Sequence, residues 1–382
     1  MTTPTEQKPL SASTIVLLGV LTALATVVNN LYSPAMLLLC EHYDASPSQI
    51  QFGLTAAMLG LALGQIIIGP LTDRYGRRTL LLWSMAGFTA VSAAAPFSPS
   101  LPVLYGFRFA QGFLAGGGIV ISRSVATDSA SGTALVRVLA VMNVVNGIAP
   151  IVTPMLSTWL STQWGWTAVF AAMTGVGALL VIWTRRLPET LTTPTLTQNY
   201  WSGLWRVWTM RRFSLSVGQQ CGALIFLFGN IALTPFLITH EYGMSPKTIG
   251  YSLALNGVFT TLGAGFAARR DAGWGIRVSA VGMTAAGIAL TAVVAAQMGY
   301  WAYEAVMCAT LFFVGMTLTS SSSQAMDAGR AYTGSASAML GAAGFVVGGI
   351  TAPLMGLTAP AAIFCFAAVT VFSCWTISNR KT

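Results

Sequence analysis

One long uninterrupted apolar stretch of the chain, residues 138–184, strongly limits what it can fold into. It contains no Asp, Glu, Lys or Arg. A helix needs about 20 predominantly apolar residues to cross a bilayer, so this stretch can hold two such helices with a turn at STQWGW. Charged residues make up 8% of the chain and the mean hydropathy is +0.69, whereas a soluble domain carries roughly 25% charged residues. The sequence therefore predicts a membrane protein.

Apolar runs of this kind recur along the chain and predict twelve membrane-spanning helices. Residues 331–379 can hold two of them, with the turn at GLTAP. Eight further runs are each expected to hold one helix, and they cover residues 10–40, 45–72, 79–107, 101–122, 213–240, 248–268, 278–303 and 305–326. The first run, which follows Lys8, could instead be a signal peptide, but it is longer than such a segment needs and ends without a small-residue cleavage site.

The positions of Lys and Arg predict the orientation of these helices. If the N-terminus lies in the cytoplasm, twelve helices place all 19 Lys and Arg residues except Arg108 and Lys247 in cytoplasmic segments. Positive charge favours that side, so we expect a multi-pass protein of the bacterial inner membrane with both termini in the cytoplasm. The basic residues fall singly or in pairs between apolar runs, which argues against a nucleic-acid partner. The five scattered Cys residues predict neither a metal site nor a disulfide.

Short segments return at an offset of 199 residues. YDASPSQI at 43–50 aligns with YGMSPKTI at 242–249. If this is more than shared membrane composition, the chain consists of two six-helix halves, residues 1–184 and 213–382, joined by a cytoplasmic linker at 185–212. Transporters built from such repeats place the substrate between the halves.

One turn concentrates charge in a chain that has little of it. GPLTDRYGRR at 69–78 places one Asp and three Arg between two apolar runs. Gly69 and Pro70 are expected to end a helix, and Gly76 to permit a tight turn. Asp73 can pair with Arg77 or with a helix end of the other half. Arg74 and Arg78 can lie at the lipid headgroups or bind acidic partners such as Asp128. These residues predict a conformational gate, the alternative being a plain basic loop.

Four stretches resemble the major facilitator superfamily. GPLTDRYGRR resembles its motif A, and RFAQGFLAGG at 108–117 resembles its fourth-helix motif. APIVTPMLST at 149–158, with Pro150, Pro154 and Ser157, resembles the fifth-helix antiporter motif of drug:proton antiporters, and NNLYSPAML at 29–37 resembles the first-helix signature of Bcr/CflA-like exporters. The resemblance implies an all-α membrane fold of two pseudo-symmetric six-helix halves, acting as a monomer without a cofactor and driven by the proton gradient. Two positions depart from the pattern, because Asn30 replaces the acidic residue of the first-helix signature, and Ser157 and Thr158 replace the paired glycines.

Polar side chains inside the apolar runs are the candidates for binding a small-molecule substrate. They are Asn29, Asn30, Tyr32, Arg108, Gln111 and Asn230. A charge within the bilayer is costly unless it faces a cavity or a partner, and by resemblance Arg108 takes part in substrate binding or proton-coupled switching. The alternative for Arg108 is extension to the outer headgroups, and the alternative for the Asn pairs is hydrogen bonding between packed helices.

Proton coupling needs a group that can be neutral or charged. Within the predicted spans only Glu304 qualifies, and it lies close to the outer face. Glu41 and Glu241 stand at the outer ends of the first and seventh helices. We expect all three to be solvated helix ends, which leaves proton coupling as an implication of the resemblance without its usual carrier.

These observations together predict a secondary active transporter that exports small amphipathic molecules, such as phenicol-type antibiotics, by alternating access and proton antiport. An endogenous metabolite or siderophore is an alternative substrate, and transport without protons is an alternative mechanism. A non-transporting sensor on the same fold is a third possibility. An enzyme is not expected, because the chain has no HExxH or GxSxG motif and no carboxylate cluster within the membrane.

Overall fold

The computed structural model describes residues 11–357 except 131, 192–199 and 330–332, and its regular elements there are all helical. The α-helices are α1 (Ala12–Thr22), α2 (Leu24–Tyr43), α3 (Pro47–Tyr75), α4 (Arg77–Ala94), α5 (Leu101–Ser129), α6 (Gly132–Trp164), α7 (Trp166–Thr184), α8 (Tyr200–Thr209), α9 (Arg211–Phe236), α10 (Lys247–Ala268), α11 (Ala272–Ala295), α12 (Tyr300–Ala328) and α13 (Thr333–Leu357). A 3-10 turn, η1 (Ala95–Phe97), follows α4, and a π-helical turn, η2 (Leu237–Glu241), follows α9.

The helices agree with the predicted apolar runs. Within the described residues, eight helices are long and apolar enough to cross a membrane, and the count is nine if α1 and α2, which meet at 51°, form one bent span. α5 and α10 have 29 and 22 residues but are less apolar. The predicted twelfth span lies beyond residue 357, outside the described residues.

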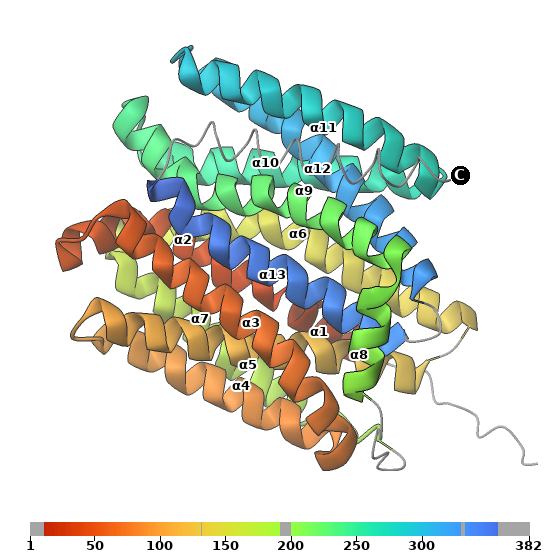
Figure 1. Cartoon of the computed structure of the whole chain (residues 1–382). Coiled ribbons are helices and arrows are strands. Elements are labelled where there is room, and N and C mark those ends of the chain that lie inside the picture. The colour runs from red at the N-terminus through yellow and green to blue at the C-terminus, as the bar shows by residue number, and fades with distance from the viewer. Residues whose placement is uncertain (1–10, 131, 192–199, 330–332, 358–382) are drawn as a thin grey trace, which may run out of the picture.

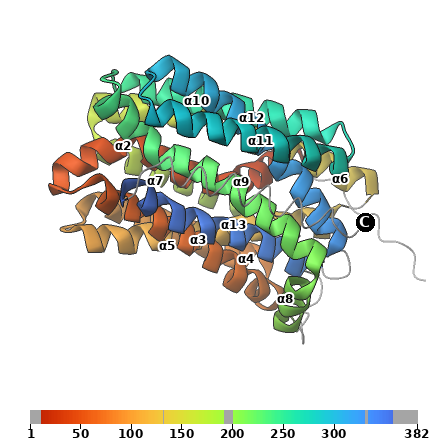
Figure 2. The same ribbon diagram turned by 45° about the horizontal axis from the view of Figure 1, so that its top comes forward.

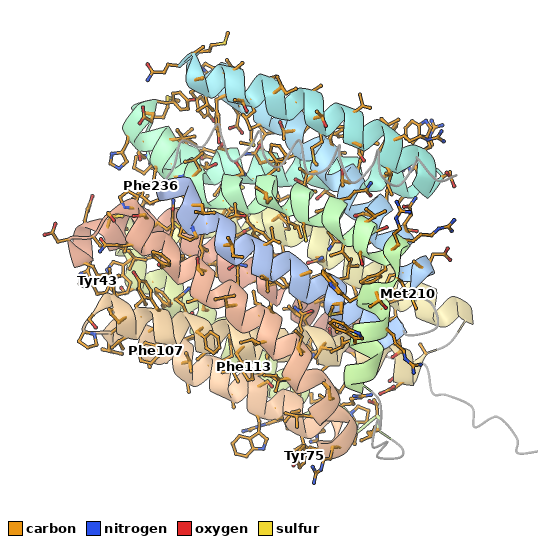
Figure 3. All side chains as sticks on the ribbon, in the orientation of Figure 1. Tyr43, Tyr75, Phe107, Phe113, Met210 and Phe236 are labelled. Atoms are coloured by element: carbon orange, nitrogen blue, oxygen red, sulfur yellow. The ribbon has the colours of Figure 1, made fainter. Side chains whose placement is uncertain are left out.

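The ends of the helices gather at two ends of the bundle (Figure 1). Figure 3 places Tyr75 and Met210 near one end and Tyr43 and Phe236 near the other. We call the first the arginine-rich end, because it carries the α3–α4 turn, the segment after α7 and the start of α9, with Arg74, Arg77, Arg78, Arg185, Arg186, Arg211 and Arg212. The short helix α8, from the predicted linker, lies at this end and crosses the others steeply (Figure 1).

The first repeated segment, YDASPSQI, begins a helix in the way its residues predict. Ser46 caps α3 by accepting a hydrogen bond from the backbone N–H of Gln49, whose side chain in turn accepts from the N–H of Ser46. This reciprocal pair satisfies two donors at the helix start, and Pro47 occupies the first turn, where no donor is required.

Two helix pairs with the same geometry lie in the first half (α1–α7) and the second half (α9–α13). A Cβ atom on Gly64 of α3 would lie 2.1 Å from the Phe113 carbonyl oxygen of α5, and one on Gly263 of α10 would lie 1.9 Å from the Phe312 oxygen of α12. Such contact requires glycine. Gly64 and Gly263 are 199 positions apart, which is the offset of the sequence repeat.

The two halves pack against each other mainly through α3 with α13 and through α6 with α10. Figures 1 and 2 both show α13 between α3 and α9. The largest buried apolar cluster belongs to the first half together with one side of α9, and a second cluster joins α9, α11 and α12. Each half therefore has its own core, and α9 contributes to both.

Candidate substrate site

A cavity of about 300 Å³ lies between the two halves. Five helices of the first half (α1, α2, α3, α5 and α6) and three of the second (α9, α12 and α13) line it. Arg123 lines the cavity and is nevertheless exposed, so solvent reaches the cavity from the arginine-rich end of α5.

Direct contact between the halves closes the opposite end. The Ser33 hydroxyl of α2 donates to the Ile231 carbonyl of α9 (2.5 Å), and the Gln51 amide of α3 donates to the neighbouring Ala232 carbonyl (3.0 Å). Pro235 has no N–H and therefore leaves the Ile231 carbonyl, four residues earlier, without its helical partner. The first half supplies the missing donor.

Polar groups line the first-half side of the cavity. Asn29, Asn30, Gln65, Arg123 and Asn146 all face it. The Oδ1 atom of Asn29 is buried without a hydrogen-bond partner. This side therefore offers polar groups to a bound molecule.

The second-half side of the same cavity is mainly apolar. Its wall consists of Leu224, Leu227, Phe228, Ile231, Leu318 and Phe345. The polar side chains of this wall, Gln220 and Ser322, are already hydrogen-bonded. The Ser322 hydroxyl donates to Gln220 Oε1 (3.0 Å), and Gln220 Nε2 donates to the Leu340 carbonyl (3.4 Å). A molecule in the cavity meets amides and a guanidinium on one side and hydrocarbon on the other.

Asn29 and Asn30 are the predicted substrate residues that reach this cavity. Tyr32, Arg108, Gln111 and Asn230 are not among its described lining residues. We expected polar groups of both halves to converge on the centre, whereas those that do converge come mainly from the first half.

Arg108 lies in a dry site behind the cavity wall, with none of its surface exposed. Its guanidinium donates to Gln111 Oε1 (2.9 Å) and to the Val28 carbonyl (3.0 Å), and it lies 4.3 Å from the centre of the Tyr32 ring. The alternative that Arg108 extends to the headgroups is wrong, because neighbouring carbonyls and an aromatic face satisfy it inside the half. No described carboxylate pairs with it.

Glu304 is also buried, at 4% exposure, which contradicts the expectation of a solvated helix end. The Ser252 hydroxyl of α10 donates to its Oε2, and the Cys308 thiol lies 4.0 Å from its Oε1. Glu41 and Glu241, in contrast, are exposed as expected. Among the described residues, no three His, Cys, Asp or Glu side chains gather into a metal-binding group.

Asn230 belongs to the same polar network of the second half. Its Oδ1 accepts from Thr234 (2.8 Å) and from Asn256 Nδ2 (3.5 Å), and the Cys308 thiol lies 3.5 Å from Asn256 Oδ1. The contacts therefore run from Glu304 through Cys308 and Asn256 to Asn230 on α9, next to the cavity residue Ile231.

The charged turn at 69–78 joins three helix ends of the first half. Arg77 Nε donates to Asp128 Oδ2 (3.0 Å), and its Nη1 donates to the Thr72 hydroxyl. The arginine that meets Asp128 is thus Arg77, and not Arg74 or Arg78 as we expected; Arg74 stacks on its neighbour Tyr75. Gly76 lies in the predicted tight turn, where its φ of +93° is one that favours glycine.

The prediction that Gly69 and Pro70 end a helix is wrong. α3 continues through both to Tyr75, as membrane helices tolerate an internal proline when neighbouring groups satisfy the freed carbonyl. Gly69 faces Val120 of α5, so it belongs to the contact between these two helices. The side chain of Asp73 lies outside the described residues.

Glu189 is a partner of this turn that the sequence analysis missed. Its carboxylate accepts hydrogen bonds from the backbone N–H groups of Arg77 (2.9 Å) and Arg78 (3.1 Å) at the start of α4. An acidic group at a helix N-terminus satisfies free donors and complements the helix dipole. Glu189 is the one acidic residue between positions 185 and 212, and this single negative charge in a basic segment is the sequence signal that points to it.

The predicted antiporter motif lies on α6 where the halves meet. Pro150 lines the cavity, and a Cβ atom on Gly257 of α10 would lie 3.0 Å from its carbonyl group. The Pro154 carbonyl would lie 3.3 Å from a Cβ on Gly250 of the same helix. Ser157 instead points within its own half and donates to the Leu31 carbonyl.

Comparison with known proteins agrees with this architecture. The family model of the Major Facilitator Superfamily matches residues 18–353. An uncharacterized MFS-type transporter of Bacillus subtilis, YdgK, is 29% identical over 91% of this chain and 89% of its own, and a bicyclomycin resistance protein homolog of Haemophilus influenzae is 25% identical over 89% and 88%. The xylose transporter XylE of E. coli, 13% identical, has the same fold with a TM-score of 0.71 over 97% of this chain and 98% of its own. The chain is a multi-pass membrane protein that belongs to the Major Facilitator Superfamily of transporters.

Proposed function

We propose that this protein is a secondary active exporter of small amphipathic molecules that works by alternating access in the bacterial inner membrane. The observation that carries the proposal is the cavity between the halves, which solvent reaches at the arginine-rich end and which the bonds of Ser33 and Gln51 close at the other. Alternating access requires such a state and its inverse. Because basic segments favour the cytoplasm, the cavity faces the cytoplasm in this state.

Export of foreign compounds is supported by the character of the cavity and by the name of one relative. A cavity with an apolar wall and a few polar groups suits amphipathic molecules, and the H. influenzae relative is named for bicyclomycin resistance. Phenicol-type antibiotics are candidates for the substrate. An endogenous metabolite or siderophore is the alternative, and it would use the same cavity.

We further propose proton antiport with Glu304 as the proton-carrying group. Its titratable neighbours are Tyr300, Tyr303 and Cys308, and Tyr242 lies against both tyrosine rings. None of these is basic, so a carboxylate there has no described cation to offset its burial. Protonation removes that cost, which gives the site two states of different free energy.

The network from Glu304 to Asn230 supports coupling to the cavity. Asn230 precedes Ile231, whose carbonyl takes part in closing the opposite end. A change of charge at Glu304 would first alter the hydrogen bonds that Ser252 and Cys308 make with it. Through Asn256 and Asn230, this change would then shift the position of α9. Release of a proton would thereby favour one of the two states.

Everted membrane vesicles test the proposal. Accumulation of radiolabelled compounds, including chloramphenicol, is measured with and without a pH gradient, in vesicles with the protein and in vesicles without it. We expect accumulation that depends on the protein and disappears when the gradient is removed. Protein-dependent accumulation that is the same with and without the pH gradient would refute proton coupling. If no compound of the panel accumulates in a protein-dependent way, the exporter proposal is refuted.

A further inference from the structure

Arg123 is the one charged side chain among the described residues that line the cavity. It lies on α5, and it is exposed, whereas Arg108 on the same helix is fully buried. An arginine within a membrane helix is costly unless it faces water or a partner. Arg123 meets this condition by facing the cavity.

The guanidinium of Arg123 is mostly unoccupied. A guanidinium has five N–H donors, and the described contact of Arg123 is one hydrogen bond from Nη1 to the Ser337 hydroxyl of α13 (3.2 Å). No described acidic side chain pairs with it. The cavity therefore presents a positive charge with free donors.

The groups around Arg123 are arranged for an amphipathic ligand. Asn29, Asn30 and Asn146 face the same cavity from α2 and α6, and each of their side-chain amides carries N–H donors that an oxyanion can accept from. Across the cavity, Phe228 and Phe345 belong to the apolar wall, and their rings lie 6.2 Å apart. A ligand with an oxyanion at one end and an aromatic or aliphatic body at the other would satisfy both sides.

We propose that Arg123 is the substrate-recognition residue for organic anions, namely amphipathic weak acids that carry a carboxylate. This inference rests on the proposed function and narrows it to a substrate class. The carboxylate accepts two hydrogen bonds from the guanidinium, a geometry that matches both groups, and the apolar body lies against the second half. A cationic compound of the same shape meets an uncompensated positive charge and is excluded.

Equilibrium binding to the purified full-length protein in nanodiscs of zwitterionic lipid tests this assignment without transport. The probes share one ring system and differ in charge: 2-naphthoate, 2-naphthamide and 2-naphthylmethylammonium. We expect naphthoate to bind at least about tenfold more tightly than the other two, a difference of about 1.4 kcal/mol. If naphthoate binds no better than the amide, or does not bind, the assignment is wrong.

Four variants separate the charge of Arg123 from its structural contact. Arg123→Gln should abolish the preference for naphthoate while leaving the affinity for naphthamide, and Arg123→Lys should retain most of the preference. Ser337→Ala removes the described partner and Arg212→Gln removes an exposed charge at the same end, so both should behave as wild type. An unchanged preference in Arg123→Gln would overturn the proposal.

Transport assays in vesicles, with the same variants whose binding is measured in nanodiscs, distinguish this inference from the exporter proposal. If naphthoate binds through Arg123 but no compound crosses the vesicle membrane, the proposed anion site is supported and the proposed exporter function is refuted. If wild type and Arg123→Gln export neutral compounds equally while naphthoate binds no better than naphthamide, the exporter function is supported and the anion site is refuted.

Discussion

In the first half of the molecule α5 carries a fully buried cation, Arg108, whereas in the second half α12 buries a carboxyl group, Glu304. α5 and α12 are equivalent helices, because Gly116 and Gly315 make the same close contacts at an offset of 199 residues. The cavity repeats the contrast, with side-chain amides and Arg123 on the first-half side and a mainly apolar wall on the second. The comparison teaches that a duplicated scaffold can keep its helix contacts while its polar positions take on separate tasks. Under the proposed function, binding would belong mainly to the first half and coupling to the second.

The largest expected effect comes from removing the carboxyl group of the second half. Glu304→Gln keeps the size and the hydrogen bond to Ser252 but cannot release a proton, so export driven by a pH gradient should fall at least about tenfold. Equilibrium binding should stay unchanged if coupling alone resides there. Initial rates in everted vesicles give the first quantity and nanodisc titration the second.

Exposed carboxylates provide the matched control for that experiment. Glu41→Gln and Glu241→Gln change the same group at helix ends that face solvent, and both should transport as wild type. If either abolishes coupling while Glu304→Gln does not, the proton-carrying group has been assigned to the wrong place.

The scaffold itself should respond equally in both halves. Gly64→Ala and Gly263→Ala each place a methyl group about 2 Å from a backbone carbonyl oxygen, and overpacking of this kind costs about 1–3 kcal/mol. Thermal unfolding in detergent should show similar losses for the two variants. A loss confined to one half would break the equivalence of α3–α5 and α10–α12.

The division of labour predicts different effects for two asparagines. Asn29→Leu removes an unpartnered acceptor from the cavity and should weaken the binding of a substrate that donates to it about tenfold, as expected for the loss of one hydrogen bond. Asn230→Leu should leave binding nearly unchanged and impair coupling instead, since Asn230 joins the Glu304 network. Equal losses of affinity in both variants would argue that the halves share binding.

The smallest effect is expected at the turn between α3 and α4. Glu189→Gln keeps an acceptor for the N–H groups of Arg77 and Arg78 but removes the charge that favours a helix N-terminus, a change of about 0.3–1 kcal/mol. We expect a slight loss of thermal stability and a modest change in transport rate. A matched variant, Glu241→Gln, should show neither, because Glu241 is exposed near the opposite end.

The membrane helices and the close helix pairs could be predicted because they depend on local patterns. Apolar runs indicated the positions of the spans, and the tight turn at Gly76 was predicted from the place of this glycine between two apolar runs. The repeat offset of 199 residues places Gly64 and Gly263 at equivalent positions of the sequence, and both lie at close helix contacts. The length, apolarity and spacing of these segments can be read from the sequence without knowledge of which helices pack together.

The burial of single polar residues could not be predicted, because it depends on which helices cover them. Glu304 stands four positions after the start of α12 and resembles a solvated helix end, yet α10 covers it through Ser252. Arg108 is satisfied by carbonyls of α2 and α3 that no spacing identifies. The role of Arg123 likewise depends on the cavity that other helices form around it.

Pro235 has a consequence for the opening step of the proposed cycle. When the halves separate at that end, Ser33 leaves the Ile231 carbonyl, and the backbone N–H that would bond this carbonyl in a regular helix is absent at Pro235. We expect water to take the place of the Ser33 hydroxyl. Each turn of the cycle would draw solvent into the outer vestibule, so raising the osmotic pressure with an excluded solute should slow turnover.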